Sequence, residues 1–111
     1  MSESQYLRQS APPPQGFQSL GDLTGVKKEI LCLIECESGG DPYAWNKKDP
    51  NGGSKGILQF QEPTFYQYAK EVGIRNPDIW NPEQQIEVAT YLLSENKQYL
   101  WTCARKCNIK K

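Results

Sequence analysis

Four cysteines, arranged in two pairs, constrain the fold of this 111-residue chain more than any other feature. The first pair is Cys32 and Cys36, and the second is Cys103 and Cys107. Residues four apart lie on one face of a helix, so each pair would present two sulfur atoms side by side. Two helices joined by two disulfide bonds would satisfy this pattern, and they would indicate an oxidising compartment.

A zinc site is the alternative use of four cysteines. The sequence weakens this interpretation, because the chain has no histidine and lacks the CxxC spacing that is typical of zinc knuckles. We therefore expect disulfide bonds, no metal and no organic cofactor. Disulfide bonds also suit the composition, since hydrophobic residues make up only 37% of the chain and leave a lean core.

The length and charge of the chain fit one small domain that does not bind nucleic acid. A chain of 111 residues has no room for a second core, and its formal net charge is zero. The segment 97–111 is basic and carries no acid, and a solvated end is favoured over a surface for an anionic partner. No stretch approaches the roughly 18–20 apolar residues of a membrane span. We expect a monomer without such a span.

The first 22 residues have the composition of a flexible arm or linker. They include APPPQG and show little apolar periodicity. The opening stretch MSESQYLRQS lacks the charged-then-apolar layout of a secretory signal. We expect that a signal was removed or that the domain was cut from a longer protein, and that residues 23–111 form the folded domain.

Capping and turn residues predict a mainly α domain whose first helix is followed by an irregular segment. Thr24 suits the N-cap of the first helix, and Gly39-Gly40 would end it. Its apolar side would comprise Val26, Ile30, Leu31, Leu33 and Ile34. The turn-rich residues 41–56 predict irregular structure or a short hairpin about Asn51-Gly52.

Two further helices are predicted in the second half of the domain. Pro63 suits the first turn of one helix, which Gly73 would end. Asn81-Pro82 supplies an N-cap and a first helical residue for the other. Its buried stripe would comprise Ile86, Ala89, Leu92 and Leu93. Residues 99–106 predict a short turn or helix brought back by the cysteines.

The segment CESGG at residues 36–40 places Glu37 where a helix is about to end. A helix C-terminus carries partial negative charge, which disfavours a second anion there. Beside apolar walls, this carboxyl would keep its proton to higher pH and would suit a general acid that protonates a glycosidic oxygen. The alternative is an ordinary exposed acid on a last helical turn.

Four motifs in order make the chain resemble the lysozyme-like domains of resuscitation-promoting factors and related soluble lytic transglycosylases. They are CESGG, GILQFQEPTF at 56–65, NPEQQIEVATYLL at 81–93 and WTC at 101–103. The resemblance covers roughly residues 26–103. It implies a small lysozyme-like domain with the irregular or hairpin segment beside a cleft, and cleavage of peptidoglycan between N-acetylmuramic acid and N-acetylglucosamine.

The resemblance also assigns roles to residues. Glu37 would be the catalytic acid, and Gln59 would line the sugar cleft. Thr64 and Phe65 match the Thr-aromatic pair of the family, whereas the helix with Gln85 and Ala89 would be mostly scaffold. Cys36 and Cys103 match the disulfide of resuscitation-promoting factors. For the extra Cys32 and Cys107, we infer a second bridge from their parallel spacing, on the expectation that the two helices cross antiparallel.

Other candidate residues have a structural interpretation beside the functional one. A polar Gln59 within the apolar run ILQF should have a partner if buried, and a sugar hydroxyl or acetamido group would serve. Asn51 suits a turn as well as substrate binding, and the Tyr91 hydroxyl could orient a sugar acetamido group. Core packing is favoured over sugar binding for each of Trp45, Phe60, Phe65, Trp80 and Tyr91. Trp101 is expected to pack against a disulfide.

A second carboxylate is not secured by the sequence. Most glycosidases use two, but Asp41 and Asp49 both lie in turn contexts, and Glu35 faces another side of the helix of Glu37. A single acid fits the lytic transglycosylase scheme, in which the N-acetyl group of the substrate assists; hydrolysis by water is the close variant. We expect a secreted or envelope enzyme. The alternative is a non-catalytic peptidoglycan-binding module, or a module of a phage particle or secretion apparatus.

Overall fold

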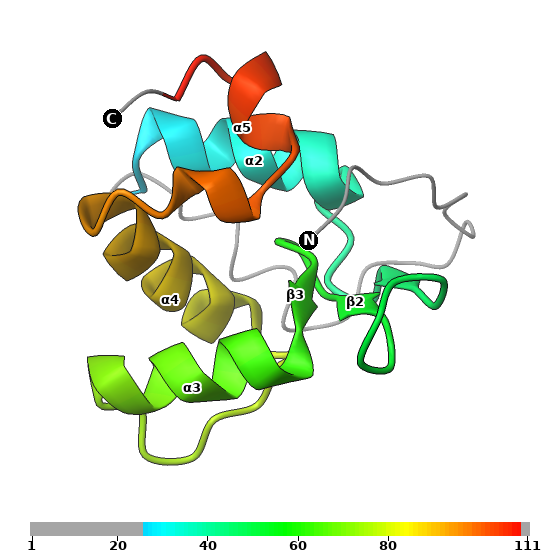
Figure 1. Cartoon of the computed structure of the whole chain (residues 1–111), viewed down its shortest axis with the longest axis vertical. Coiled ribbons are helices and arrows are strands. Elements are labelled where there is room, and N and C mark those ends of the chain that lie inside the picture. The colour runs from blue at the N-terminus through cyan, green and yellow to red at the C-terminus, as the bar shows by residue number, and fades with distance from the viewer. Residues whose placement is uncertain (1–25, 110–111) are drawn as a thin grey trace.

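The structure of the protein is a computed structural model, which describes residues 26–109. The predicted arm over residues 1–22 lies outside these residues, as does Thr24. The prediction that Thr24 caps the first helix is wrong, because that helix begins at Lys28 and its N-cap is Lys27. The helices are α2 (Lys28–Ser38), α3 (Glu62–Val72), α4 (Pro82–Ser94), the 3-10 helix η2 (Gln98–Leu100) and α5 (Cys103–Lys106). The strands are β1 (Trp45–Asn46), β2 (Ser54–Lys55) and β3 (Phe60–Gln61). The predicted mainly α class is confirmed (Figure 1).

Helix α2 buries one stripe and ends at a glycine. Its buried residues are Ile30, Leu33, Ile34, Glu37 and Ser38, which recur at the three- and four-residue spacing of a single helix face. Gly39 follows with a φ of 65° and donates its amide to the carbonyl of Glu35, which confirms the predicted glycine stop. Leu31, which was predicted on the apolar side, is instead 38% exposed because it lies beside the stripe.

The segment between α2 and α3 forms a small antiparallel sheet in the order β1-β2-β3. Trp45 lies opposite Lys55, and Lys55 lies opposite Phe60. The predicted short hairpin is therefore present as β1 and β2, and Asn51 and Gly52 in its loop have φ values of 62° and 85°. In Figure 1 this sheet lies at one side of the helices, beside the start of α3.

Helices α3 and α4 pack against each other, and the predicted end of α3 and start of α4 are confirmed. Gly73 ends α3 with a φ of 93°. Asn81 caps α4 by accepting the amide of Gln84, and Pro82 is its first residue. The predicted stripe of α4 was partly wrong, because Ile86 and Leu93 are only partly buried. The buried residues of α4 are Pro82, Gln85, Val88, Ala89 and Leu92.

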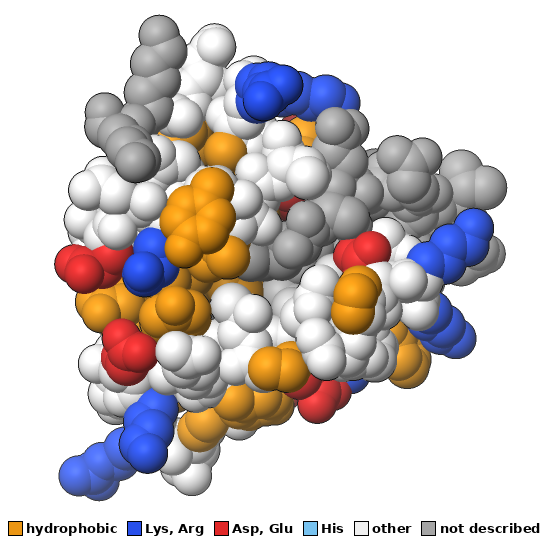
Figure 2. All heavy atoms as spheres, viewed as in Figure 1, with side chains coloured by type: hydrophobic (Ala, Val, Ile, Leu, Met, Phe, Trp, Pro, Cys, Tyr) orange, Lys and Arg blue, Asp and Glu red, His pale blue; other side chains and the backbone are white. Residues whose placement is uncertain are grey.

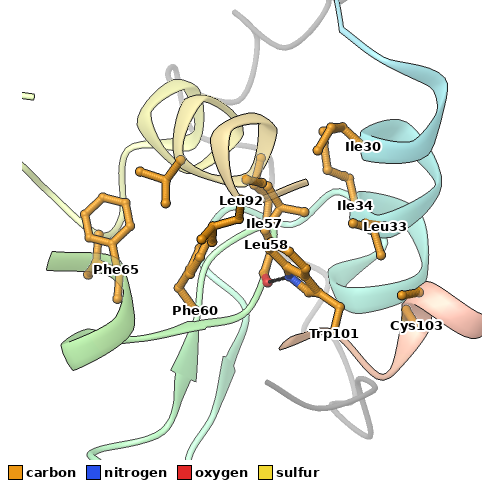
Figure 3. Packing of buried hydrophobic residues seen from close by; sticks show 14 of the residues in the cluster. Ile30, Leu33, Ile34, Ile57, Leu58, Phe60, Phe65, Leu92, Trp101 and Cys103 are labelled. Carbon is orange, nitrogen blue, oxygen red and sulfur yellow. Dashed lines mark hydrogen bonds between the residues drawn. The ribbon is translucent and has the colours of Figure 1, made fainter. Parts of the chain in front are cut away.

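The hydrophobic core collects side chains from α2, the sheet, α3, α4 and the C-terminal segment (Figure 3). The Phe60 ring lies between two others, 5.7 Å from the centroid of Phe65 and 5.6 Å from that of Trp101. Trp101 also donates its indole N–H to the carbonyl of Leu58 at 2.9 Å, the bond that is dashed in Figure 3. The C-terminal segment is therefore anchored in the core by packing and by a buried hydrogen bond.

Two disulfide bonds join α2 to α5, which lie side by side (Figure 1). The bridges are Cys32–Cys107 and Cys36–Cys103, so both predicted pairings are confirmed. The order is that of two antiparallel helices, because the earlier cysteine of α2 pairs with the later one of the C-terminal segment. The second bridge holds the last turn of α2, where Glu37 is found, to the C-terminal segment.

The face of the molecule in Figure 2 carries acidic and basic side chains interspersed with separate hydrophobic patches. This distribution agrees with the formal net charge of zero and shows no extended basic surface on that face. Between residues 26 and 109, none of the helices is both long enough and apolar enough to cross a membrane.

We expect the two bridges to stabilise the fold non-additively. Each closes a loop of 67 or 75 residues when it is alone, which corresponds to about 4.5 kcal/mol in the chain-entropy model. While the other bridge is intact, each closes only a small ring, worth about 3 kcal/mol. A variant in which the two cysteines of one bridge are replaced by alanine should therefore lose less than half of the free energy of unfolding that is lost when both bridges are removed. Denaturant unfolding measures both losses. Equal, strictly additive losses would contradict this account.

Candidate functional site

The site begins with a carboxyl group on the buried stripe of α2. Glu37 is fully buried and lies seven residues after Ile30, in line with Leu33 and Ile34 on the core-facing side of the helix. It is one residue before the last residue of α2, where the helix dipole disfavours an anion. The predicted helix-end position of Glu37 is confirmed, and the alternative of an ordinary exposed acid is wrong.

Ser38 connects this helix end to the turn between β2 and β3. Its hydroxyl donates to the carbonyl of Ile57 at 2.8 Å and accepts the amide of Gly40 at 3.1 Å. Ser38 is buried, and its bond to Ile57 is shielded from water. The side chain next to Glu37 therefore fixes how the 56–59 turn lies against the end of α2.

Gln59 lies in this turn in a conformation that few non-glycine residues adopt. Its φ is 55°, in the left-handed region, and its side chain is fully buried. The amide Nε2 donates to the carbonyls of Ala44 and Gly56, at 3.2 Å and 3.0 Å. The buried Oε1 accepts no hydrogen bond from residues 26–109. The unsatisfied buried acceptor and the left-handed backbone conformation together mark Gln59 as a candidate functional residue.

Gln85 holds the same turn from α4. Its Oε1 accepts the amide of Leu58 at 2.8 Å, and its Nε2 donates to the carbonyl of Lys55 at 2.9 Å and to that of Ile79. A Cβ atom on Gly56 would lie only 2.2 Å from Nε2 of Gln85. The backbone of Gly56 can therefore approach Gln85 this closely only because glycine has no side chain.

The other predicted substrate-binding residues are placed differently. Thr64 lies half-buried in the first turn of α3. Phe65 is fully buried in the core, so its contacts are packing contacts. Asn51 is exposed at the hairpin and donates to Oε1 of Gln61 at 2.9 Å, which ties the hairpin to β3.

Tyr91 belongs to another part of the surface. Its hydroxyl donates to Glu71 at 3.0 Å, and its ring lies 6.4 Å from that of Tyr68. The hydrogen bond to Glu71, followed by desolvation and by the negative charge of Glu71, raises the pKa of Tyr91. Glu71 is in the last turn of α3, at the opposite end of that helix from β3. The structure thus brings together Glu37 and the Gln59 turn, but not Tyr91.

The candidates for a second carboxylate serve the turns in which they occur. Asp41 accepts the amide of Tyr43 at 2.9 Å, and Asp49 accepts the hydroxyl of Ser54 at 2.5 Å. Glu35 is exposed on α2. Within residues 26–109, no group of three or more acidic or cysteine side chains is arranged to hold a metal ion.

Two residues that hold the site were not predicted to do so from the sequence. Ser38 had no predicted role, and Gln85 was predicted to belong mostly to the scaffold. A signal for Gln85 was present, because it falls in the helical register of Val88, Ala89 and Leu92 on the buried side of α4. A glutamine in such a stripe must satisfy its amide by hydrogen bonds, as does a glutamine in ILQF. Ser38 lies next to Glu37 in the register of Ile30 and Ile34, which is the same kind of signal.

Comparison with known proteins identifies a family that matches this chain. Residues 21–105 match the family model described as a transglycosylase SLT domain. No match was found among the curated proteins or among the solved structures. The family match covers the CESGG segment, the 56–59 turn and α4, and it agrees with the transglycosylase part of the predicted resemblance. A closer relationship to resuscitation-promoting factors stays a prediction.

Gly56 and Gly73 offer a matched test of how closely the site is packed. Both have a positive φ, but a Cβ at Gly73 would meet nothing within 4 Å. Gly73→Ala should cost about 1 kcal/mol from backbone strain alone. Gly56→Ala adds the collision with Gln85 and should cost about 3 kcal/mol in chemical denaturation. If the two variants lose the same stability, the contact with Gln85 does not constrain the turn.

Proposed function

Because the chain belongs to the transglycosylase SLT domain family, we propose that it cleaves the glycan strand of peptidoglycan between N-acetylmuramic acid and N-acetylglucosamine. Lytic transglycosylase-type cleavage of peptidoglycan is the activity of this family. The observation that carries the proposal for this chain is the fully buried Glu37 carboxyl at the end of α2, joined through Ser38 to the turn of Gln59.

Glu37 is the general acid in this proposal. Glu37 is fully buried and lies at the C-terminal end of α2, so its carboxyl is held in a defined position. Its role in the proposal is to supply the proton that the glycosidic oxygen requires. The αL cap at Gly39 and the Cys36–Cys103 bridge hold the helix end, and this fixes the direction from which the proton is delivered.

Gln59 positions the substrate in this proposal. Its Nε2 is used by two backbone carbonyls, which leaves Oε1 as the acceptor that we assign to a ligand donor. A sugar hydroxyl or the N–H of an acetamido group supplies such a donor. Since the side chain is fully buried and fixed at its nitrogen, the acceptor is pre-organised before the glycan arrives.

The reaction proposed is an intramolecular transfer. Glu37 gives its proton to the bridging oxygen as the bond from C1 of the muramic acid breaks, and the acetamido group of the same sugar stabilises the electron-poor carbon. The Glu37 carboxylate then takes the proton of the C6 hydroxyl while the C6 oxygen forms a bond to C1. This step yields a 1,6-anhydro ring. The acid is thereby regenerated and no water is consumed. Asp41 and Asp49 are both engaged in turns, which favours this single-acid scheme.

The compartment follows from the cysteines. All four cysteines are in disulfide bonds, and such bonds persist outside the cytoplasm. We place the enzyme in an extracellular or periplasmic environment, where peptidoglycan is accessible.

Glu37→Gln should reduce release of muropeptides from purified cell walls by about 100-fold or more, because the amide keeps the shape but supplies no proton. Glu35→Gln is the matched control, since Glu35 is an exposed acid two residues earlier on the same helix. Circular dichroism and thermal unfolding should show both variants folded. Wild-type cleavage by a folded Glu37→Gln variant would remove Glu37 from the mechanism. A wild-type protein that binds walls without releasing muropeptides would instead be a binding module.

The products distinguish transfer from hydrolysis. A tethered C6 hydroxyl has an advantage over free water that can reach several kcal/mol of barrier. Mass spectrometry of the digest should therefore show 1,6-anhydromuramyl ends, lighter by one water than reducing ends. Reducing ends alone would identify a hydrolase and make Asp41 and Asp49 the first residues to test as its second carboxylate.

A further inference from the structure

A pocket between η2 and α5 lies apart from the residues proposed to act on the glycan. It encloses about 670 Å³. Within residues 26–109, every residue that lines it belongs to the segment 98–109, and none belongs to α2, the sheet or the 56–59 turn. In Figure 1, α5 lies at the opposite end of the molecule from α3. We name this feature the C-terminal pocket.

A turn after α5 forms one wall of the C-terminal pocket. Asn108 has a φ of 56°, in the left-handed region that asparagine tolerates. The amide of Ile109 then donates to the carbonyl of Ala104 at 3.0 Å, which brings Ile109 back beside α5. The bridges at Cys103 and Cys107 hold α5 against α2. The wall is therefore fixed before any occupant arrives, which lowers the cost of binding.

The base of the pocket is apolar. Trp101 and Ala104 line it and are buried. Because the indole N–H of Trp101 already donates to the carbonyl of Leu58, the ring offers the pocket only apolar surface. Ile109 is half-buried, and Tyr99 is 71% exposed. An occupant must therefore bring an apolar group to cover these side chains.

The rim of the pocket is cationic. Arg105 and Lys106 both line the pocket, and both are exposed. The segment 97–109 carries Lys97 as a third cation and has no aspartate or glutamate. Within residues 26–109, Arg105 takes part in no ion pair. Its guanidinium presents several N–H donors in one plane, so the rim is complementary to a carboxylate.

We propose that the C-terminal pocket binds a short acidic segment of a partner protein. An apolar side chain of that segment packs on Trp101, and a neighbouring carboxylate pairs with Arg105. Pockets of about 300–1,000 Å³ hold small ligands, so this one takes a few residues of a peptide and not a folded domain. The inference goes beyond the function proposed above, because neither Glu37 nor Gln59 lines the pocket.

A peptide fits this lining better than other polymers of a cell envelope do. Polyol phosphates carry charge but little apolar surface, so they would pair with Arg105 and leave the base of the pocket uncovered. The N-acetylated sugars of a glycan strand bring little charge to the rim. A segment in which acidic and apolar residues alternate satisfies the rim and the base together.

Labelled peptides in which charge and apolar content vary separately test this proposal on the full chain. A short peptide that alternates glutamate with leucine should bind, as measured by fluorescence anisotropy. Its affinity should fall about ten-fold or more when lysine replaces glutamate, and likewise when serine replaces leucine. Binding should also weaken as the salt concentration is raised. Absence of binding by the glutamate–leucine peptide, or equal binding of all three peptides, would overturn the proposal.

A charge reversal locates the binding. Arg105→Glu should lower the affinity for the glutamate–leucine peptide by about ten-fold or more, because it replaces an attraction with a repulsion. Arg75→Glu is the matched control, since Arg75 is exposed outside the pocket and the change in net charge is the same. Similar losses in the two variants would assign the effect to net charge and contradict binding at the pocket.

Competition identifies the source of the peptide. A soluble muropeptide, whose peptide stem carries carboxylates, should displace the labelled peptide at least about ten-fold more weakly than an unlabelled copy of that peptide does. Equal displacement that is lost in Arg105→Glu would assign the pocket to the substrate and reject a protein partner. Arg105→Glu should release muropeptides from cell walls at the wild-type rate. Failure of the wild-type protein to release them would reject the proposed function without altering the peptide-binding result.

Discussion

The buried turn at residues 56–59 is the part of the structure on which the rest depends. It is irregular backbone in the interior, so each of its polar groups needs a partner that no regular strand or helix supplies. Side chains from three other segments provide them: Ser38 of α2 to Ile57, Gln85 of α4 to Leu58, and Trp101 before α5 to Leu58. Each bond contributes about 1 kcal/mol, but leaving any of these buried groups unpaired would cost more. The turn therefore determines how three helical segments meet.

The disulfide bonds also fix the position of α2 relative to the C-terminal segment. They bind α2 to α5, and Trp101 precedes α5 by two residues, so the bridges also fix the segment that donates to Leu58. One side of α2 is thus held covalently and its end is held by Ser38. A domain of this size has a small core, and cross-links restrict the unfolded chain where packing alone supplies little. This allows the end of α2 to carry a buried carboxyl rather than a hydrophobic residue.

Much of the fold could be predicted because its signals are local. The glycine after α2, the Asn-Pro start of α4 and the i,i+4 cysteines act through neighbouring backbone, and these features are confirmed. The burial of Leu31, Ile86 and Leu93 was harder to predict. Hydrophobic residues on neighbouring positions of a helix fit two adjacent faces equally well, so the pattern does not decide which face is buried. The hydrogen-bond partners of the Ser38 and Gln85 side chains lie in a turn that is distant in the sequence, so hydrophobic periodicity could not identify them. The left-handed φ of Gln59 likewise follows from tertiary contacts.

Strain and burial in this domain coincide with the residues proposed to act on substrate. Gln59 adopts a backbone conformation that costs about 1–3 kcal/mol for a non-glycine residue, and Glu37 places a carboxyl in the interior. The left-handed conformation of Gln59 does not stabilise the fold by itself, so it must be offset by the hydrogen bonds around the 56–59 turn. A residue chosen only for stability at this position would be glycine. The presence of glutamine there agrees with the substrate-positioning role proposed for it.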